Sequence, residues 1–213
     1  SSYSMSKRMG WMGRINYSYL GRYLASVSVR HDGDSRLAKD EKWQTFPAFS
    51  LGWRISDEKF MESTKNWLDN LKLRVGYGET GSTSNISPYA STSKIEQSYL
   101  TIGGEKITTY GYSKEVANKK LTWERSKSWN IGLDAAFLNS RIDLSMDWYL
   151  TNTSNVIWHK NLPVTGGAYN STTQYLTNVN LAETRNKGIE LTLNTRNIVT
   201  KDFKWNSTLT FNY

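Results

Sequence analysis

Residues 129–150 alternate between apolar and polar side chains with a period of two, interrupted once at residues 138–141. The apolar rows are Trp129, Ile131, Leu133, Ala135 and Phe137, then Ile142, Leu144, Met146, Trp148 and Leu150. This period places each row on one face of a β-strand. Each row spans about nine residues, enough for a tilted strand to cross a hydrocarbon layer. The pattern predicts a hairpin of a transmembrane β-barrel, although shorter strands of a buried β-sandwich also alternate.

The same alternation predicts further strands at residues 11–20, 22–30, 43–55, 71–78, 189–194 and 203–211. Short or medium connections fall around Gly21, Ser56–Asn70, Asn139 and Asn197–Lys201, with a short helical turn expected after Ser56 or Asp57. Long loops are expected at residues 31–42, 79–120 and 151–186. Outer-membrane barrels alternate short periplasmic turns with long outer loops. The connections therefore favour an all-β fold, an antiparallel transmembrane β-barrel segment of about eight strands.

The two faces of these strands carry different side chains. The polar rows hold many charged residues, which a water-filled or plugged lumen accommodates more easily than a packed interior of eight strands. We predict that the residues facing the lumen or a plug include Arg54, Arg74, Asp134, Asp143, Asp147 and Glu190. Tryptophans near the ends of the apolar rows, namely Trp53, Trp129, Trp148 and Trp205, are predicted to form a membrane girdle. Because an open sheet edge is not viable in lipid, we expect a piece of a larger barrel.

Charge and composition exclude several other classes. The net charge of +8 comes from scattered basic residues, which fit solvated loops and anionic lipid headgroups better than a nucleic-acid surface. The absence of cysteine excludes disulfides and thiolate metal sites. No apolar run approaches the ~18 residues of a membrane helix. The chain opens with Ser1 and Ser2, without Met or an apolar signal region, so we expect a processed or partial chain.

Evidence for catalysis is weak. His31 and His159 lie in separate predicted loops, and no nucleophile, zinc or phosphate-binding motif occurs. Asp143 and Asp147 point the same way from one strand, which fits either a catalytic pair or, as we prefer, a lumen wall. The Asp32–Gly33–Asp34 stretch resembles a calcium loop but lacks the remaining ligands, so we interpret it as a turn. We predict no catalytic residue, no metal and no cofactor.

Aromatic side chains are frequent in the two longest predicted loops. We consider Tyr110, Tyr112, Trp158, Tyr169 and Tyr175 as candidate substrate contacts, with Tyr89 and Tyr99 also in these loops. Such rings can stack on the apolar face of a sugar or on a peptide side chain. Alternatively, they pack the loops together or against a partner protein.

Several segments, taken in order, resemble one family. They are RYLASVSVRHDGDSRL (Arg22–Leu37), FPAFSLGWRISDEKF (Phe46–Phe60), LDNLKLRVGYGETG (Leu68–Gly81), LTWERSKSWNIGLDAAFLNSRIDLSMDWY (Leu121–Tyr149), LPVTGG (residues 162–167) and NKGIELTL (Asn186–Leu193). The series is similar to the SusC/RagA-type TonB-dependent outer-membrane transporters, which import nutrients in Bacteroidetes. The resemblance covers nearly the whole chain, from about Arg14 to Tyr213.

The resemblance implies a 22-stranded barrel with an N-terminal plug, of which residues 1–213 look like a partial barrel domain. The plug, the TonB-box and the family's terminal strand are not recognisable in this sequence. The implied function is TonB-dependent import of oligosaccharides or oligopeptides in a Gram-negative outer membrane. The implied partners are a SusD-like surface lipoprotein, a TonB complex and outer-membrane lipid. The alternatives are a secreted, aromatic-rich β-sandwich that binds carbohydrate and an outer-membrane barrel enzyme.

Overall fold

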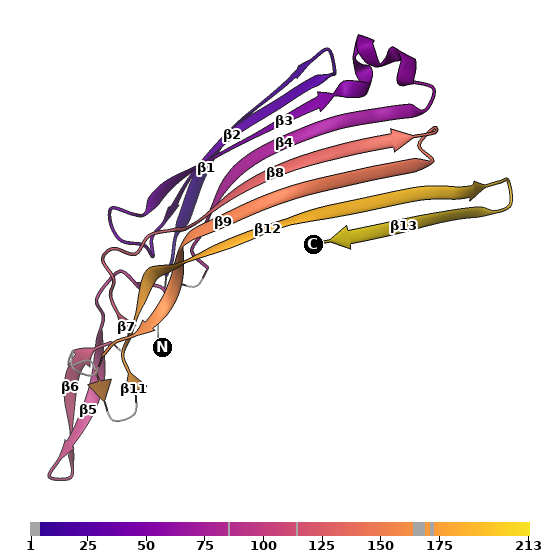
Figure 1. Ribbon diagram of the computed structural model, residues 1–213. Coiled ribbons are helices and arrows are strands. Elements are labelled where there is room, and N and C mark those ends of the chain that lie inside the picture. The colour runs from indigo at the N-terminus through magenta and orange to yellow at the C-terminus, as the bar shows by residue number, and fades with distance from the viewer. Residues whose placement is uncertain (1–4, 85, 114, 164–168, 171–172) are drawn as a thin grey trace.

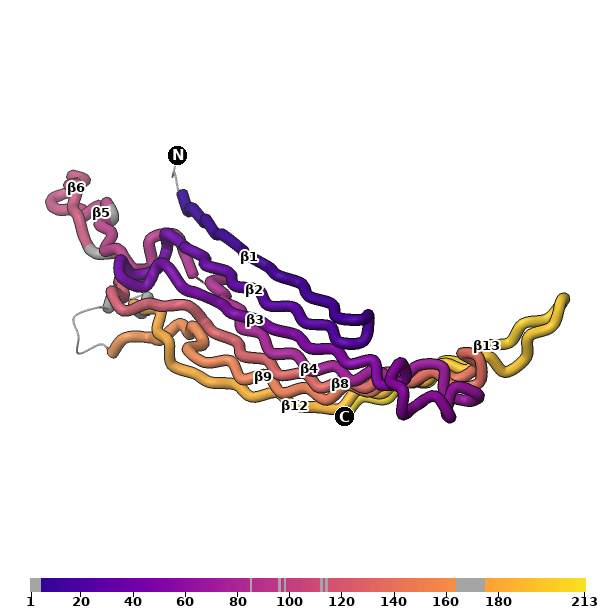
Figure 2. The backbone as a smooth tube through the Cα atoms, turned by 90° about the horizontal axis from the view of Figure 1, so that it is seen from above, coloured from indigo at the N-terminus to yellow at the C-terminus, as the bar shows by residue number. Residues whose placement is uncertain are grey.

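The computed structural model describes residues 5–84, 86–113, 115–163, 169–170 and 173–213. In that part of the chain, the main sheet has the order β1-β2-β3-β4-β8-β9-β12-β13, with all neighbours antiparallel. The strands are β1 (Arg8–Tyr19), β2 (Tyr23–Asp34), β3 (Trp43–Arg54), β4 (Leu68–Ser82), β8 (Glu124–Phe137), β9 (Ile142–Asn161), β12 (Leu176–Val199) and β13 (Lys204–Asn212). Figures 1 and 2 show a long, curved sheet that is open between β1 and β13. The predicted antiparallel barrel segment is confirmed.

The connections sort to the two ends of the sheet as predicted. The β1–β2, β3–β4, β8–β9 and β12–β13 connections lie at one end, and the longer ones at the other (Figure 1). The hairpin turn at 138–140 uses three consecutive residues with positive φ, Leu138, Asn139 and Ser140. Within the described residues, no helix has the length and apolar character needed to cross a membrane.

The predicted strands exist, but several continue far beyond their apolar rows. β9 runs to Asn161 and β12 starts at Leu176, so most of the loop predicted at 151–186 is strand. β2 likewise continues to Asp34, which means that the turn predicted at Asp32–Asp34 is wrong. In these extensions the face that carries the apolar rows becomes polar. The period of two therefore disappears, while the ladder of backbone hydrogen bonds between the strands continues. The ladder does not need apolar side chains, and the sequence pattern therefore missed it.

The segment predicted as an irregular loop, 79–120, contains further strands. The hairpin of β5 (Ile95–Ile102) and β6 (Glu105–Tyr112) projects from the long-connection end of the sheet (Figure 1). Gly103 and Gly104, both with positive φ, form its two-residue turn, a conformation that suits glycine. β7 (Glu115–Val116) pairs in parallel with the start of β12, and β10 (Tyr169–Asn170) pairs with β11 (Thr173–Gln174).

The medium connection contains short 3-10 helices, η1 (Ile55–Asp57) and η2 (Lys59–Thr64), where a helical turn was expected. The expected cap by Ser56 or Asp57 is wrong, because Arg54 and Glu58 are the N-cap residues and neither makes a side-chain cap. Glu58 instead anchors the connection to the sheet. Its carboxylate accepts hydrogen bonds from the Tyr23 hydroxyl at 2.5 Å, Arg22 Nη1 at 2.8 Å and Trp53 Nε1 at 3.1 Å.

A buried apolar cluster lies at the long-connection end. It consists of Leu37, Phe46, Ile86, Ala90, Leu121, Trp123 and Ile157. Backbone hydrogen bonds join the same connections, from Ala38 N to Leu121 O and from Asn118 N to Ala90 O. Trp123 packs edge-on against Phe46 and donates its indole N–H to the Lys42 carbonyl. The long connections therefore form a folded layer, which we call the loop base, rather than separate loops.

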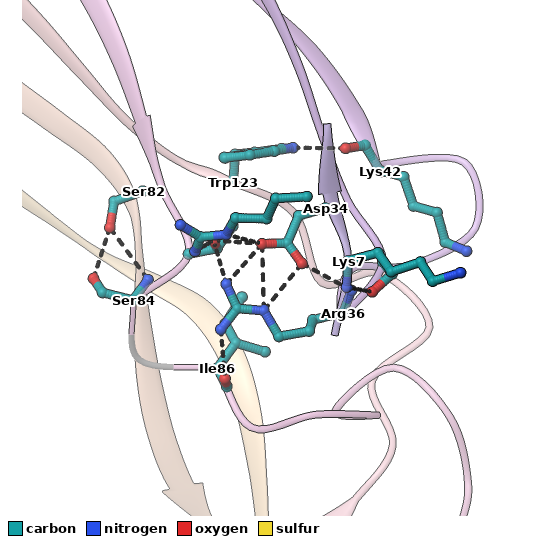
Figure 3. A network of polar contacts seen from close by, with 11 residues as sticks. Lys7, Asp34, Arg36, Lys42, Ser82, Ser84, Ile86 and Trp123 are labelled. Atoms are coloured by element: carbon teal, nitrogen blue, oxygen red, sulfur yellow. Dashed lines mark hydrogen bonds and ion pairs between the residues drawn. The ribbon is translucent and has the colours of Figure 1, made fainter. Parts of the chain in front are cut away.

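An ionic network centred on Asp34 joins this layer to β1 and β2 (Figure 3). The Asp34 carboxylate accepts from Arg8 Nε at 2.7 Å, from Arg36 Nη2 at 2.6 Å and from the Thr83 hydroxyl at 2.8 Å. Arg36 also donates to the Ile86 carbonyl at 3.1 Å. Both Asp34 and Thr83 are 1% exposed. One buried carboxylate therefore connects three segments that are distant in the sequence.

The protonation of Asp34 reflects two opposing effects. Burial alone would raise the pKa of this carboxyl group, because it disfavours the charged form. Hydrogen bonds from the Arg36 side chain and backbone, from Thr83 and from Arg8 favour the charged form more strongly. The pKa of Asp34 is therefore held well below its ordinary value.

We predict that Gly81→Ala destabilises the loop base. A Cβ at Gly81 would lie 2.2 Å from Phe46 Cζ and 2.8 Å from Trp123 Cε3. Because both rings are packed, the expected loss is about 1–3 kcal/mol in the free energy of unfolding. Urea unfolding of the protein folded in detergent, followed by tryptophan fluorescence, measures this loss. Gly78→Ala on the same strand is the control, since its nearest contact is at 3.5 Å; equal losses in both variants would contradict the packing argument.

We predict that Asp34→Asn costs about 3 kcal/mol near neutral pH, because it leaves two arginines without their carboxylate. The folded-state pKa of Asp34 is depressed, so its stabilisation is complete above the unfolded value of about 3.9 and is lost as pH falls below it. The free energy of unfolding is measured for both proteins between pH 8 and pH 3. The difference between them should be constant down to about pH 4 and should become smaller below it. Asp40→Asn, at an exposed position, should leave stability unchanged at every pH.

Candidate functional site

The strand register places all the predicted lumen residues on one face of the sheet. Residues paired across antiparallel strands share a face. One row runs Gly52, Arg74, Gly132, Asp147 and Glu190 from β3 to β12. The adjacent rows add Arg54 opposite Lys72, Lys72 opposite Asp134, and Asp143 opposite Ala136. All six predicted residues, Arg54, Arg74, Asp134, Asp143, Asp147 and Glu190, therefore lie on this polar face.

Arg74 is the centre of an ion-pair network on the polar face. Its Nε and Nη2 donate to the two oxygens of Asp134 at 2.7 and 2.9 Å, and Nη2 also donates to Asp147 Oδ2 at 3.0 Å. The Ser145 hydroxyl donates to Asp134 Oδ1 at 2.9 Å. Gly132 leaves room for this arrangement, because a Cβ there would lie 2.5 Å from Arg74 Cζ. A bidentate pair with a second carboxylate holds the guanidinium in a fixed orientation.

The same network bears on the catalytic alternative for Asp143 and Asp147. Asp147 is engaged by Arg74, and the Cα atoms of residues four apart in a strand are separated by roughly 13 Å. A glycosidase pair needs its carboxyl groups about 5–9.5 Å apart. The geometry therefore favours a wall of fixed charges over an acid–base pair.

Each face of the sheet carries a hollow, and polar side chains border only one of the two extensively. On the polar face, a hollow of about 440 Å³ is bordered by Asn16, Ser26, Ser50, Lys72, Arg74 and Asn130. On the other face, a hollow of about 440 Å³ is bordered by apolar residues such as Tyr17, Leu51, Trp53 and Val75. One sheet therefore presents a hydrophilic wall to one side and an apolar wall to the other.

The four predicted girdle tryptophans, Trp53, Trp129, Trp148 and Trp205, lie on the apolar face by the same register. Trp129 packs against Tyr77 at 4.7 Å between ring centroids and against Phe49 at 5.9 Å. Trp129, Trp148 and Trp205 remain 41%, 37% and 53% exposed. Large exposed rings aligned on one face indicate a surface that is covered by an apolar medium or partner.

The candidate substrate aromatics are not brought together. Tyr110 is strongly exposed on the β5–β6 hairpin, and Tyr175, next to the start of β12, is half-buried. Trp158 lies on β9 beside Ile157, which is buried in the loop base, so the alternation directs Trp158 to the opposite side. The side chains of Tyr112 and Tyr169 lie outside the described residues. Tyr110 and Tyr175 are the candidates that the geometry leaves available on the loop side.

Both histidines lie on strands rather than in the predicted loops. His31 on β2 stacks with Trp11 and Trp43 at 6.2 and 5.2 Å between centroids. This stack depends on Gly33, because a Cβ there would lie 2.7 Å from the Trp43 ring. His159 on β9 pairs with Asn178. The two histidines therefore belong to separate environments and form no joint site.

The aspartates of the calcium-like stretch are engaged by arginines. Asp32 pairs with Arg30 at 2.6 Å, and Asp34 is the centre of the network of the loop base. Among the described residues, no group of three or more His, Cys, Asp or Glu is arranged to hold a metal ion. The contacts of Arg36 and Thr83, 47 residues apart, were missed because no local pattern signals a contact at that distance in sequence.

Comparison with known proteins identifies the family. A family model described as "TonB dependent receptor-like, beta-barrel" matches residues 2–213. The chain is 39% identical over 202 residues to the TonB-dependent receptor SusC of Bacteroides thetaiotaomicron, covering 92% of this chain and 19% of SusC. It is 34% identical over 199 residues to the TonB-dependent receptor P3 of Formosa agariphila, covering 93% and 19%.

A solved structure shows the same arrangement. The RagAB peptide transporter matches with a TM-score of 0.84 at 25% identity, over 98% of this chain and 22% of that one. The chain therefore spans about a fifth of the length of these relatives. Their names describe receptors and transporters, which is consistent with the prediction of a protein that is not an enzyme. This chain belongs to the TonB-dependent receptor β-barrel family, and within it is a barrel fragment of the SusC/RagA type.

Proposed function

We propose that this chain is part of the barrel wall of an outer-membrane importer that takes up oligosaccharides or oligopeptides with energy delivered through TonB. The observation that carries the proposal is a sheet with one apolar side and one charged side, in a chain that aligns along 92% of its length with SusC. The charged side, with Arg74, Asp134 and Asp147 fixed to one another, would line the lumen and contact a plug. The apolar side would contact lipid.

The positions of the aromatic residues support insertion in a membrane. At the short-turn end, the row of paired residues that starts at Tyr19 on β1 crosses the sheet and reaches β13 at Phe211. The aromatic residue of β13 nearest this end, Trp205, is offset from that row by six residues. At the other end, the row of paired residues that contains Trp129 on β8 reaches β1 at Ile15. Trp11 on β1 is offset from that row by four residues.

Both offsets run in the same direction across the sheet. With a rise of about 3.3 Å per residue and a strand spacing of about 4.8 Å, they correspond to strands tilted by roughly 30–35°. Strands of outer-membrane barrels tilt by about 35–45°, with aromatic girdles at both interfaces. From Trp11 to Tyr19 the apolar face then rises by roughly 22 Å, close to the ~25 Å of such a barrel's apolar band. The girdle tryptophans would therefore lie at two parallel interfaces.

The β5–β6 hairpin supports a partner at the long-connection end. Its exposed apolar residues include Ile95, Tyr99, Leu100, Ile102 and Ile107. A two-stranded hairpin is marginally stable on its own in water, and this one projects away from the main sheet (Figure 1). We propose that a SusD-like surface lipoprotein covers it. Substrate would be captured between that partner and the loops, where Tyr110 and Tyr175 are placed.

The decisive test is uptake by the full-length protein in its own host. We expect deletion of its gene to abolish growth on one oligomeric nutrient, either a glycan or a peptide mixture, while growth on the corresponding monomers continues. Complementation should restore growth, and a protonophore should stop uptake of labelled oligomer within minutes. Normal growth of the deletion strain on all oligomers tested would overturn the importer proposal. The nutrient that fails to support growth identifies the substrate class.

A pair of aromatic substitutions tests where substrate contacts the loops. We expect Tyr110→Ala to raise the KM for oligomer uptake about 5–30-fold, because a ring stacked on a ligand contributes about 1–2 kcal/mol. Trp158→Ala, which removes an aromatic from the opposite side of β9, should change KM less than twofold. Labelled uptake across a range of concentrations measures both values. A larger effect from Trp158 would place the substrate on the outer side of the wall.

A further inference from the structure

Three cations gather on the apolar face, next to its aromatic row at the long-connection end. Lys127 pairs with Asn152, and Asn152 pairs with Arg185, so all three residues share a face across β8, β9 and β12. Lys187 lies one row closer to the membrane centre, opposite Leu150. We call Lys127, Asn152, Arg185 and Lys187 the basic wall site; all four side chains are exposed.

The four side chains are close enough to serve one ligand. Neighbouring strands are about 4.8 Å apart, which puts the backbones of Lys127 and Arg185 roughly 10 Å apart with Asn152 between them. Lys187 lies roughly 7 Å from Arg185 along the same strand. Long, flexible Lys and Arg side chains can span these gaps and converge above Asn152. The site therefore presents three cations and one amide to a single headgroup.

The positive charge of this site is not neutralised from within the described part of the chain. None of its three cations forms an ion pair there. Glu79, in the same row, is engaged by Arg125 Nε at 2.8 Å and by the Tyr77 hydroxyl. Glu183 is exposed on the irregular stretch of β12 near Arg185 and contributes a single negative charge. The balance remains positive and favours an anionic ligand.

The apolar row below the site decides between kinds of anion. Trp129 and Leu150 lie in the row of Lys187, and the next row contains Ile131, Trp148 and Ile189. A free anion would gain nothing from these side chains, whereas a lipid would place its acyl chains on them. Cations on the lipid-facing side are costly at mid-bilayer but tolerated at headgroup level. The long-connection end faces the cell exterior in such barrels, so the lipid belongs to the outer leaflet.

We propose that the basic wall site binds the phosphate groups of an outer-leaflet glycolipid of the lipid A class. Arg185 would hold a phosphate with its planar, forked donors, and the two lysines would contribute point charges from either side. Asn152 would donate to a headgroup oxygen, while Trp129 and Leu150 pack against the acyl chains. This inference rests on the proposed insertion in the outer membrane and assigns a lipid ligand to the outside of the barrel.

The test uses the full-length protein, purified in detergent, stripped of lipid and titrated with bisphosphorylated lipid A. Native mass spectrometry counts the bound lipid. The variant Lys127→Gln/Arg185→Gln/Lys187→Gln should bind roughly 100-fold more weakly, because each basic side chain near an anionic surface strengthens binding about fivefold. The control variant Lys119→Gln/Lys120→Gln/Lys201→Gln removes the same charge from exposed positions elsewhere and should change affinity less than threefold. Lipid A without phosphates should bind the native protein and the wall variant alike.

Equal affinity of the native protein and the wall variant for lipid A would overturn the proposal. If the native protein binds phosphatidylglycerol as tightly as lipid A, the site recognises any anionic headgroup and the glycolipid proposal is wrong. If inorganic phosphate competes with lipid A, the site binds free phosphate and the proposal is also wrong. Oligomer uptake by the wall variant is measured in parallel and should stay near native. A failure of the importer proposal would then appear in uptake and a failure of this one in the lipid titration, so the two remain distinguishable.

Discussion

The backbone hydrogen bonds of the sheet are the constraint on which the rest of this structure depends. A strand in lipid has no water to satisfy its N–H and C=O groups, so every interior strand must be paired along its whole membrane length. The ladder from β1 to β13 achieves this with continuous antiparallel register and a few bulges in β4, β9 and β12. Once the register is set, alternation determines which side chains lie on the apolar face and which lie on the polar face. A slip of one residue would move Arg74 and its partners to the apolar face.

The charged face shows how this arrangement accommodates groups that would be costly elsewhere. Arg74 meets Asp134 and Asp147 because the register places their rows side by side, and Gly132 leaves the space that the guanidinium occupies. These ion pairs hold the Arg74 guanidinium and the two carboxylates in fixed positions on the polar face. The outer face has the opposite chemistry, with rings at its edges and cations only next to the long-connection end. The two faces are therefore specialised for different surroundings although they alternate along the same strands.

The sequence predicted the strands wherever one face is apolar, since the period of two is then visible, as in residues 129–150. It also predicted which connections lie at each end of the sheet and which residues share the polar face. It missed β9 beyond Leu150 and the start of β12, because strands that leave the apolar layer keep their hydrogen bonds but lose their pattern. It missed the Asp34 network entirely. Contacts between residues as distant as Arg8, Arg36 and Thr83 arise from chain topology, and single-sequence periodicity contains no information about them.

The loop base explains how a barrel of this kind can vary its specificity without losing its fold. The apolar cluster and Asp34 anchor the long connections to the strand ends, where a change would cost stability. The β5–β6 hairpin extends beyond this base as a separate two-stranded sheet with exposed apolar side chains. Substitutions there alter the surface offered to a ligand or partner while the anchoring residues remain intact. If the proposed import function holds, selection for a new substrate can act on this hairpin, because the residues that anchor the base to the strands lie outside it.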